Sequence, residues 1–235
     1  MALALLMYWF ALILTGIATI HNQFGLAEAA FYNLGVIYGL SGKNIPDPYS
    51  TVDLYENVGS RKIRLMEHND YVKLALNNTG RFEVSIGVRN DELPEIASSI
   101  HAAESWYELR VKPYHRGLVF DYIVVRNDAI PGPYSAYLAL ALEHMMEVIS
   151  AFEEGTPTKR TTIVSDSILN PRFPSWVAAF KPEIKLYMEK VLKVIRRSRV
   201  QPLLMVNVFP YYDYAAGIIP KDFAVFGRQT LLLGP

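Results

Sequence analysis

Polar side chains that could do chemistry recur at one kind of position, directly after short apolar runs that are rich in β-branched residues. They are carboxylates, amides and tyrosines rather than thiols or clustered imidazoles. Aromatic rings stack on the apolar faces of a sugar ring, while amides and carboxylates pair with its hydroxyl groups. This combination is typical of a carbohydrate site. In chain order the residues are Tyr38, Glu67, His68, Asn69, Asn90, Asp91, Asn127, Asp128, Asp166, Asn207, Tyr211 and Tyr212.

Other chemistries lack the residues that they require. No glycine-rich phosphate loop follows an apolar run, no His-Glu-x-x-His motif occurs, and the five histidines are scattered. The chain has no cysteine, which excludes disulfides, zinc–thiolate sites, iron–sulfur clusters and cysteine nucleophiles. Its 23 basic residues balance 23 acidic ones, so no global field favours a polyanion. We therefore expect no metal, no cofactor and no nucleic-acid partner.

The apolar runs predict six buried strands, at residues 34–38, 62–66, 82–88, 120–125, 161–165 and 203–208. Helical patterns separate them. One helix is predicted to begin at Asp47 as N-cap and to end at Gly59, and others cover 138–152 and 182–195. Such alternation predicts an α/β fold with a parallel sheet that is covered by helices. Because the carboxyl ends of parallel strands meet at one edge, we expect the polar side chains to converge there.

The first 29 residues have the pattern of a targeting segment. Met1–Ile20 carries no charged residue, and the small-x-small triplet Ala27-Glu28-Ala29 follows, which predicts a signal peptide over residues 1–29. The chain is then expected outside the cell or in the cell wall, with no membrane association after cleavage. The alternative is a retained membrane anchor formed by residues 1–20. Asn77-Asn78-Thr79 is a short glycosylation pattern that fits secretion.

Several ordered blocks between Leu34 and Phe226 resemble a known family. They include Gly35-Val36-Ile37-Tyr38-Gly39, Ile86-Gly87-Val88-Arg89-Asn90-Asp91, Tyr122-Ile123-Val124-Val125 before Asn127, and Val206-Asn207-Val208-Phe209-Pro210-Tyr211-Tyr212. These blocks resemble glycoside hydrolase family 17, the plant endo-1,3-β-glucanases. The resemblance implies a secreted (β/α)₈ (TIM) barrel that hydrolyses 1,3-β-glucan or a related polysaccharide in cell-wall metabolism. It implies substrate contacts at Tyr38, Asn90, Asn127, Asn207 and Tyr211, while Tyr212 is interpreted as packing.

The resemblance also implies a catalytic acid. A retaining glycosidase needs two carboxyl groups about 5–5.5 Å apart, one as acid/base and one as nucleophile. The family's acid/base is the glutamate of a Gly-Asn-Glu motif, and this chain has Arg126-Asn127-Asp128 there. Asp128 is thus the candidate acid. Its shorter side chain withdraws the carboxyl by about an ångström, enough to reduce the rate roughly a hundredfold, and the Arg126 cation favours an ionised carboxylate.

The second carboxyl group is not found in the sequence. The family's nucleophile belongs to a Ser-Glu-Thr-Gly-Trp-Pro motif, which does not occur in this chain. Glu67, Asp166 and Asp213 are interpreted as rim or supporting groups rather than as nucleophiles. Met66 and Phe209 also stand where the family has tyrosines, which removes two hydroxyl contacts from the expected sugar site.

These observations leave three hypotheses. The chain is an endo-1,3-β-glucanase with Asp128 as acid, a non-catalytic 1,3-β-glucan-binding protein, or a truncated product without a stable function. Without residues 1–29 the chain is shorter than the roughly 250 residues of a complete barrel. We therefore expect residues 30–235 to form an incomplete barrel of about six of the eight βα units, with activity impaired and with apolar strand edges exposed.

Overall fold

The computed structural model describes residues 34–225 except 41, 67, 78, 81, 153–157, 172–176 and 201. The predicted signal peptide, the alternative anchor over residues 1–20 and Glu67 lie outside the described residues. The chain divides into two compact units. The first contains the residues up to Val84 together with Gly117–Val119, and the second contains Ser85–Arg116 and the residues from Phe120 onward.

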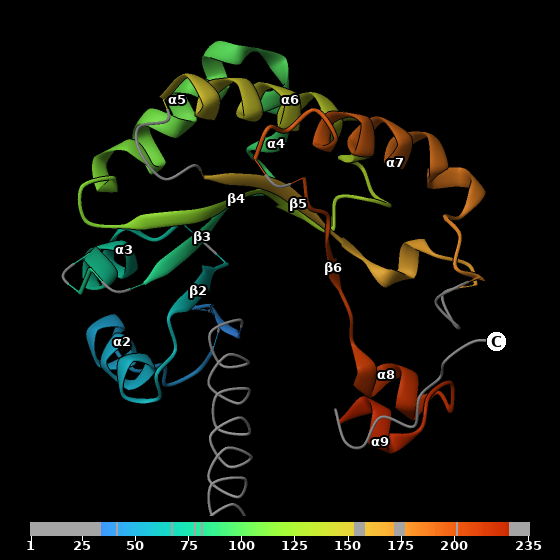
Figure 1. The fold of residues 1–235 in the computed structure, drawn as a ribbon, viewed down its shortest axis with the longest axis horizontal. Helices are drawn as coiled ribbons and strands as arrows, with labels where there is room; N and C mark the ends of the chain where they lie inside the picture. Colours follow the sequence, from blue (N-terminus) through green and yellow to red (C-terminus); the bar gives the residue numbers. More distant parts are fainter. Residues whose placement is uncertain are drawn as a thin grey trace, which may run out of the picture. The chain divides into compact units, whose positions relative to one another are not determined.

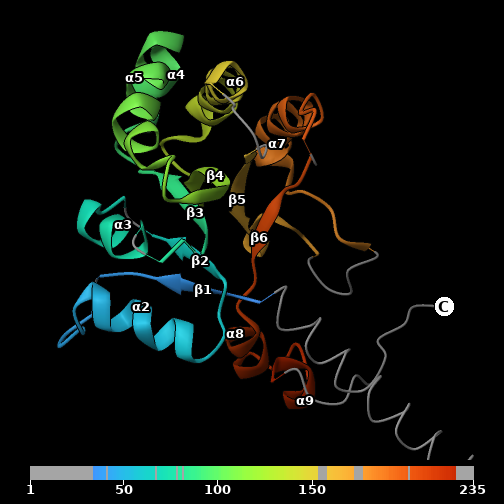
Figure 2. The same cartoon turned by 60° about the vertical axis from the view of Figure 1, so that its left-hand side comes forward.

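The first unit consists of two strands, two helices and the beginning of a third strand. They are β1 (Gly35–Tyr38), α2 (Pro48–Asn57), β2 (Lys62–Leu65), α3 (Asp70–Asn77) and the first residues of β3 (Glu83–Val88). Strands β1 and β2 pair in parallel, with Gly35 opposite Lys62 and Tyr38 opposite Leu65. Figure 2 shows β1 and β2 with α2 and α3. The buried side chains of Val52, Ile63, Leu65, Val72 and Leu76 form the core of this unit.

Helix α2 begins where the sequence predicts it. The Asp47 side chain accepts hydrogen bonds from the backbone nitrogens of Tyr49 (3.0 Å) and Ser50 (3.2 Å), and Pro48 occupies the first helical position. Two backbone donors that the helix itself leaves unpaired are thereby satisfied. Gly59 follows the helix with φ +74°, a left-handed conformation that glycine adopts without steric cost. Both predicted ends of this helix are confirmed.

The second unit carries the rest of the fold. Its helices are α4 (Leu93–Ser98), α5 (Ile100–Arg110), α6 (Ser135–Phe152), α7 (Pro182–Ile195), α8 (Pro210–Ala215) and α9 (Lys221–Ala224). Its strands are the end of β3, β4 (Val119–Asn127), β5 (Lys159–Ser165) and β6 (Met205–Asn207). Short 3₁₀ turns lie at Lys112–Tyr114 and Asp166–Ile168. The sixth strand is shorter than predicted, and two helices, α4 and α5, connect β3 and β4.

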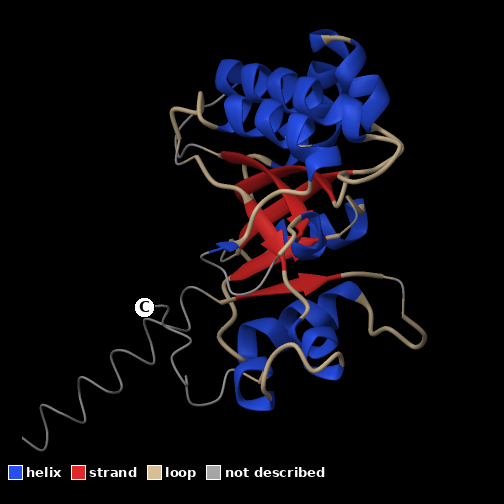
Figure 3. Cartoon of the chain, turned by 90° about the vertical axis from the view of Figure 1, so that its right-hand side faces the viewer, coloured by secondary structure: helices blue, strands red, loops and turns tan. Residues whose placement is uncertain are grey.

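Within this unit, helices α4 to α7 form a layer over β4 and β5. Figure 1 shows these helices on one side of the two strands, and in Figure 3 they form the blue band at the top of the view. Helix α6 buries Leu138, Leu142 and Met145, which the 3.6-residue periodicity placed on one face. Strands β4 and β5 contribute Ile123 and Val164 to the same core. This packing holds the carboxyl ends of β4 and β5 in place.

The six strands are hydrogen-bonded in chain order from β1 to β6. The pairs β1–β2, β4–β5 and β5–β6 are parallel. Consecutive parallel strands joined by helices are the repeating βα units of a (β/α)₈ barrel, so the α/β prediction and the count of six units are confirmed. Among the described residues, no helix combines the length and the apolar character that crossing a membrane requires.

Candidate functional site

The carboxyl end of β4 has an unusual backbone. Arg126 has φ +69° and Asp128 has φ +55°, both in the left-handed region that non-glycine residues rarely adopt. The parallel register with β5 also shifts between Val124 and Asn127. The backbone nitrogen of Asp128 donates to the Ile163 carbonyl (2.9 Å), and the Thr162 hydroxyl donates to the Arg126 carbonyl (3.3 Å). Left-handed residues of this kind cost about 1–3 kcal/mol and concentrate at functional sites.

This backbone brings Asn127 and Asp128 together with Asn207 at the end of β6. Nδ2 of Asn207 donates to Oδ2 of Asp128 at 2.8 Å and to Oδ1 of Asn127 at 3.0 Å. Nδ2 of Asn127 lies 3.4 Å from the same Asp128 oxygen. We call these three residues the amide–carboxylate cluster. The sequence-based expectation that Asn127, Asp128 and Asn207 converge at the edge of the sheet is confirmed.

The two oxygens of the Asp128 carboxyl group have different surroundings. Oδ2 accepts the hydrogen bonds of the cluster. Oδ1 is buried and accepts no hydrogen bond from the described residues. The two amide nitrogens therefore hold Oδ2 as a hydrogen-bond acceptor.

Arg126 is the buried cation of the site, with only 6% of its surface exposed. Its guanidinium carbon lies 4.5 Å from the centre of the Tyr134 ring, a cation–π contact. Burial lowers the pKa of Arg126, and the charges of Tyr134 and Asp128 oppose this shift. The sequence placed Arg126 beside the candidate acid but contained no signal for its burial or for its contact with Tyr134.

Tyr211 and Tyr212 follow the cluster on α8 and are 70% and 67% exposed. Their rings make an edge-on contact, with centroids 5.6 Å apart. Tyr211 therefore has a ring face available for a sugar. The interpretation of Tyr212 as packing is wrong, because its side chain projects from a short helix instead of entering the core. Phe209, where the resemblance implies a tyrosine, is 50% exposed and contacts Tyr212 edge-on.

Tyr38 lies at the end of β1 in the first unit and is only 6% exposed. Its ring packs edge-on against Tyr55, with a centroid distance of 6.1 Å. Its hydroxyl is buried without a hydrogen-bond partner among the described residues. The structure thus shows Tyr38 as a packing residue of this unit, and its contact with a sugar stays a prediction.

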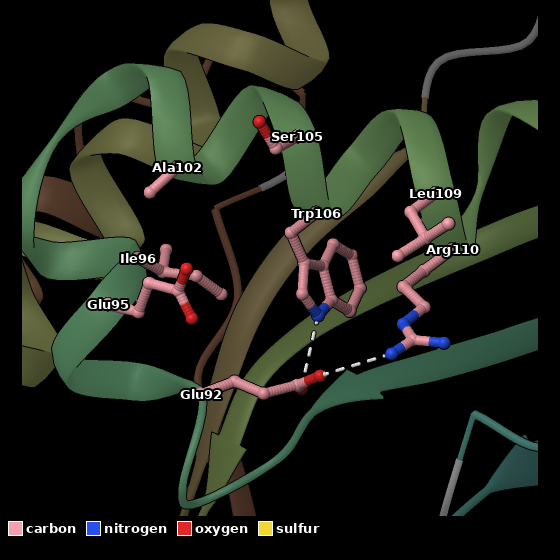
Figure 4. Close-up of a pocket in the computed structure, with 8 residues that line it drawn as sticks. All are labelled: Glu92, Glu95, Ile96, Ala102, Ser105, Trp106, Leu109 and Arg110. Atoms are coloured by element: carbon pink, nitrogen blue, oxygen red, sulfur yellow. Dashed lines mark hydrogen bonds and ion pairs between the residues drawn. The ribbon is translucent and has the colours of Figure 1, made fainter.

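Asn90 is exposed in the turn after β3, and Glu92 anchors this turn. Oε2 of Glu92 accepts from the backbone nitrogen of Arg89 (2.8 Å) and from Nε1 of Trp106 (3.1 Å). Oε1 of Glu92 is 4.0 Å from Nη2 of Arg110. Figure 4 shows the contacts of Glu92 with Trp106 and Arg110 beside a hollow of about 160 Å³ on α4 and α5. The sequence did not indicate this anchor, because Trp106 and Arg110 are distant in the chain.

The remaining predicted carboxylates have supporting positions. Asp166 opens the 3₁₀ turn after β5, where Oγ of Ser165 lies 3.4 Å from its Oδ1. Asp213 is buried in the first turn of α8. Among the described residues, no three His, Asp or Glu side chains lie close enough to hold a metal ion.

A family model described as "Glycosyl hydrolases family 17" matches residues 34–234 of this sequence. The chain belongs to glycoside hydrolase family 17. Among its relatives in this family, "Probable glucan endo-1,3-beta-glucosidase BG4" of Arabidopsis thaliana is 28% identical over 214 residues. That alignment covers 90% of this chain and 61% of the relative. The basic vacuolar isoform of glucan endo-1,3-beta-glucosidase from Nicotiana plumbaginifolia is 26% identical, covering 95% and 61%.

Two solved structures resemble this family 17 chain. A structure reported in a study of two plant β-glucan endohydrolases with distinct substrate specificities has a TM-score of 0.75 at 29% identity and aligns with 83% of this chain. CJP38, a β-1,3-glucanase and allergen of Cryptomeria japonica pollen, has a TM-score of 0.76 at 28% identity. The chain spans 62% and 61% of the lengths of these two proteins.

Proposed function

We propose that this family 17 chain binds 1,3-β-glucan at the carboxyl ends of β4 and β6. The printed names of its relatives are those of glucan endo-1,3-β-glucosidases. The amide–carboxylate cluster supplies the donors and acceptors that sugar hydroxyls need, and Tyr211 supplies an exposed ring for stacking. The predicted signal peptide would deliver the protein to the cell wall.

Binding without hydrolysis is the function that the geometry supports best. The observation that carries it is the 2.8 Å hydrogen bond from Asn207 to Oδ2 of Asp128. A catalytic acid must give a proton to the glycosidic oxygen, whereas Oδ2 is held as an acceptor and Oδ1 is buried. Retaining hydrolysis also requires a second carboxyl group about 5–5.5 Å away.

Hydrolysis is the second candidate function, and the position of Asp128 in the family's acid motif favours it. In that case Asp128 protonates the leaving oxygen, and a second carboxylate attacks the anomeric carbon or activates water. Release of reducing sugar from laminarin separates the two candidates. Turnover that is abolished by Asp128→Asn supports hydrolysis, whereas glucan binding without turnover supports the proposal.

Isothermal titration calorimetry with laminarihexaose tests the binding function directly. We expect Asn207→Ala to weaken binding about tenfold, because the sugar site loses an amide and the Asp128 carboxylate loses its orienting donor. Asn57→Ala, at the exposed end of α2, is the matched control and should leave the affinity unchanged. Absence of binding heat at millimolar sugar, or equal affinities for the wild type and Asn207→Ala, would contradict the proposal.

A further inference from the structure

A neutral glucan offers no counter-charge to the Arg126 cation of this site. Arg126 is more than nine-tenths buried, and its Nε and Nη1 donate no hydrogen bond to any described residue. Arg126 also stands where the resemblance implies glycine, at a left-handed φ of +69°. A long cation at such a position carries a backbone cost in addition to the cost of its burial.

The contacts of Arg126 compensate only part of that cost. Tyr134 provides a ring face at 4.5 Å, and the charge of Asp128 acts on Arg126 without a hydrogen bond between the two. Oδ2 of Asp128 is already engaged by Asn207, and its Oδ1 is buried without a partner. Burial lowers the pKa of Arg126, and the charges of Tyr134 and Asp128 offset only part of this shift. The free protein therefore holds an undercompensated cation beside the cluster.

The guanidinium also has a route to a ligand. Nη2 is not among the buried unpartnered atoms of Arg126, and no described residue accepts a hydrogen bond from it. Asn127 and Asp128 follow directly in the chain, so the cation and the sugar-binding groups lie on one short segment. The charge of Asp128 acts on Arg126, so a ligand that contacts this carboxylate comes within the influence of the cation.

We propose that Arg126 makes this site selective for a glycan that carries carboxylate groups, such as one containing uronic acid units. This inference rests on the proposed glucan-binding function and specifies its substrate class. Nη2 of Arg126 can donate a hydrogen bond to a carboxylate, and such charge-assisted hydrogen bonds are about twice as strong as neutral ones. The carboxylate would supply the counter-charge that the site lacks. The charge of Asp128 opposes the ligand, so the gain is about tenfold rather than larger.

The test compares two ligands that differ at C6, where a carboxylate replaces the neutral CH2OH group. Laminarihexaose and the same oligosaccharide oxidised at C6 to the uronate are titrated into the full chain by calorimetry. The oxidised ligand should bind about tenfold more tightly, and 0.5 M NaCl should reduce its affinity while leaving that of the parent nearly unchanged. Arg126→Gly, which suits the left-handed backbone, should bring the two affinities together.

Arg126→Lys is the matched variant, because it keeps the positive charge and loses the guanidinium group that carries Nη2. It should retain only part of the preference. If the parent binds and the oxidised ligand binds equally well or more weakly, the inference about Arg126 is wrong while the glucan-binding function stands. If neither ligand binds, the proposed function itself fails. An unchanged preference in a folded Arg126→Gly would also overturn the role of Arg126.

Discussion

The two ends of the β4–β5 pair contain the same three chemical groups in different states. At the amino end, Nζ of Lys159 lies 2.7 Å from Oδ1 of Asp121 and 4.8 Å from the centre of the Tyr122 ring. At the carboxyl end, Arg126 contacts the Tyr134 ring and is acted on by the charge of Asp128, yet Arg126 and Asp128 both retain buried polar atoms without partners. Both ends thus contain a cation, a carboxylate and a tyrosine. The charged groups are paired at the amino end, whereas at the carboxyl end some of their polar atoms have no partner.

The backbone differs in the same way. The amino end of β4 has no left-handed residue, whereas the carboxyl end has two within three residues. Strain and unsatisfied groups persist where a site must present its side chains to a ligand, while complete pairing serves stability. We infer that the Asp121–Lys159 end holds the two strands together and that the Arg126–Asp128 end is reserved for binding.

The largest expected effect is a loss of stability when the ion pair between Asp121 and Lys159 is removed. Lys159→Met removes the ammonium group and leaves the carboxylate of Asp121, which is 14% exposed, without its charged donor. We expect the free energy of unfolding to fall by about 1.5–3 kcal/mol, measured by urea denaturation.

An exposed ion pair provides the control for this change. Nη1 of Arg197 lies 2.6 Å from Oε1 of Glu143, and both side chains are about half exposed. Glu143→Gln should change the free energy of unfolding by less than about 0.5 kcal/mol. If Lys159→Met changed the free energy of unfolding as little as Glu143→Gln does, the Asp121–Lys159 pair would have no special role in stability.

At the carboxyl end of the β4–β5 pair, we expect a substitution to raise the free energy of unfolding. Arg126→Gly removes an undercompensated cation and relieves the left-handed backbone, so we expect a gain of about 1 kcal/mol despite the lost Tyr134 contact. Arg126→Ala removes the cation but keeps the strain, and it should be less stable than Arg126→Gly by about 1 kcal/mol. Both values come from the same urea denaturation. If Arg126→Gly lost as much stability as Lys159→Met, the conclusion that only the amino end serves stability would be wrong.

The amino-acid sequence predicted most of the fold because strand and helix periodicities persist over whole elements. The cap at Asp47 and the apolar face of α6 are local patterns, and the structure confirms them. The convergence of Asn127 with Asn207 was also predictable, because parallel strands end at one edge. The anchoring of Glu92 by Trp106 was not predictable, since it depends on how distant side chains pack.

The burial of Arg126 could not be predicted from the sequence. Its charge and its place beside Asp128 are visible in the sequence, and the cation was expected to act on the carboxylate. Its burial depends on the left-handed backbone and on the position of Tyr134, neither of which has a local pattern for a non-glycine residue. The misplaced packing role of Tyr212 has a similar cause, because α8 is too short for periodicity to define a buried face.

The smallest expected effect is a pH dependence of the stability that Lys159 contributes at the amino end of the β4–β5 pair. The hydrogen bond to Asp121 raises the pKa of Lys159 above its ordinary value of 10.5, although burial opposes the shift. The stabilisation is therefore complete below the unfolded-state pKa and is lost as pH rises through the higher folded-state pKa. The stability difference between wild type and Lys159→Met should change by only about 0.2 kcal/mol from pH 7 to 10, and should shrink above pH 10.5.

Urea denaturation of both proteins at pH 7, 9, 10 and 11 measures this difference. A loss that is already complete at pH 9 would mean that Asp121 does not hold the Lys159 charge in the folded state. Desolvation by burial lowers the pKa of Arg126, and the charges of Tyr134 and Asp128 offset only part of this shift. The two cations at opposite ends of this strand pair thus have pKa values shifted in opposite directions, that of Lys159 upward through its hydrogen bond to Asp121 and that of Arg126 downward through burial.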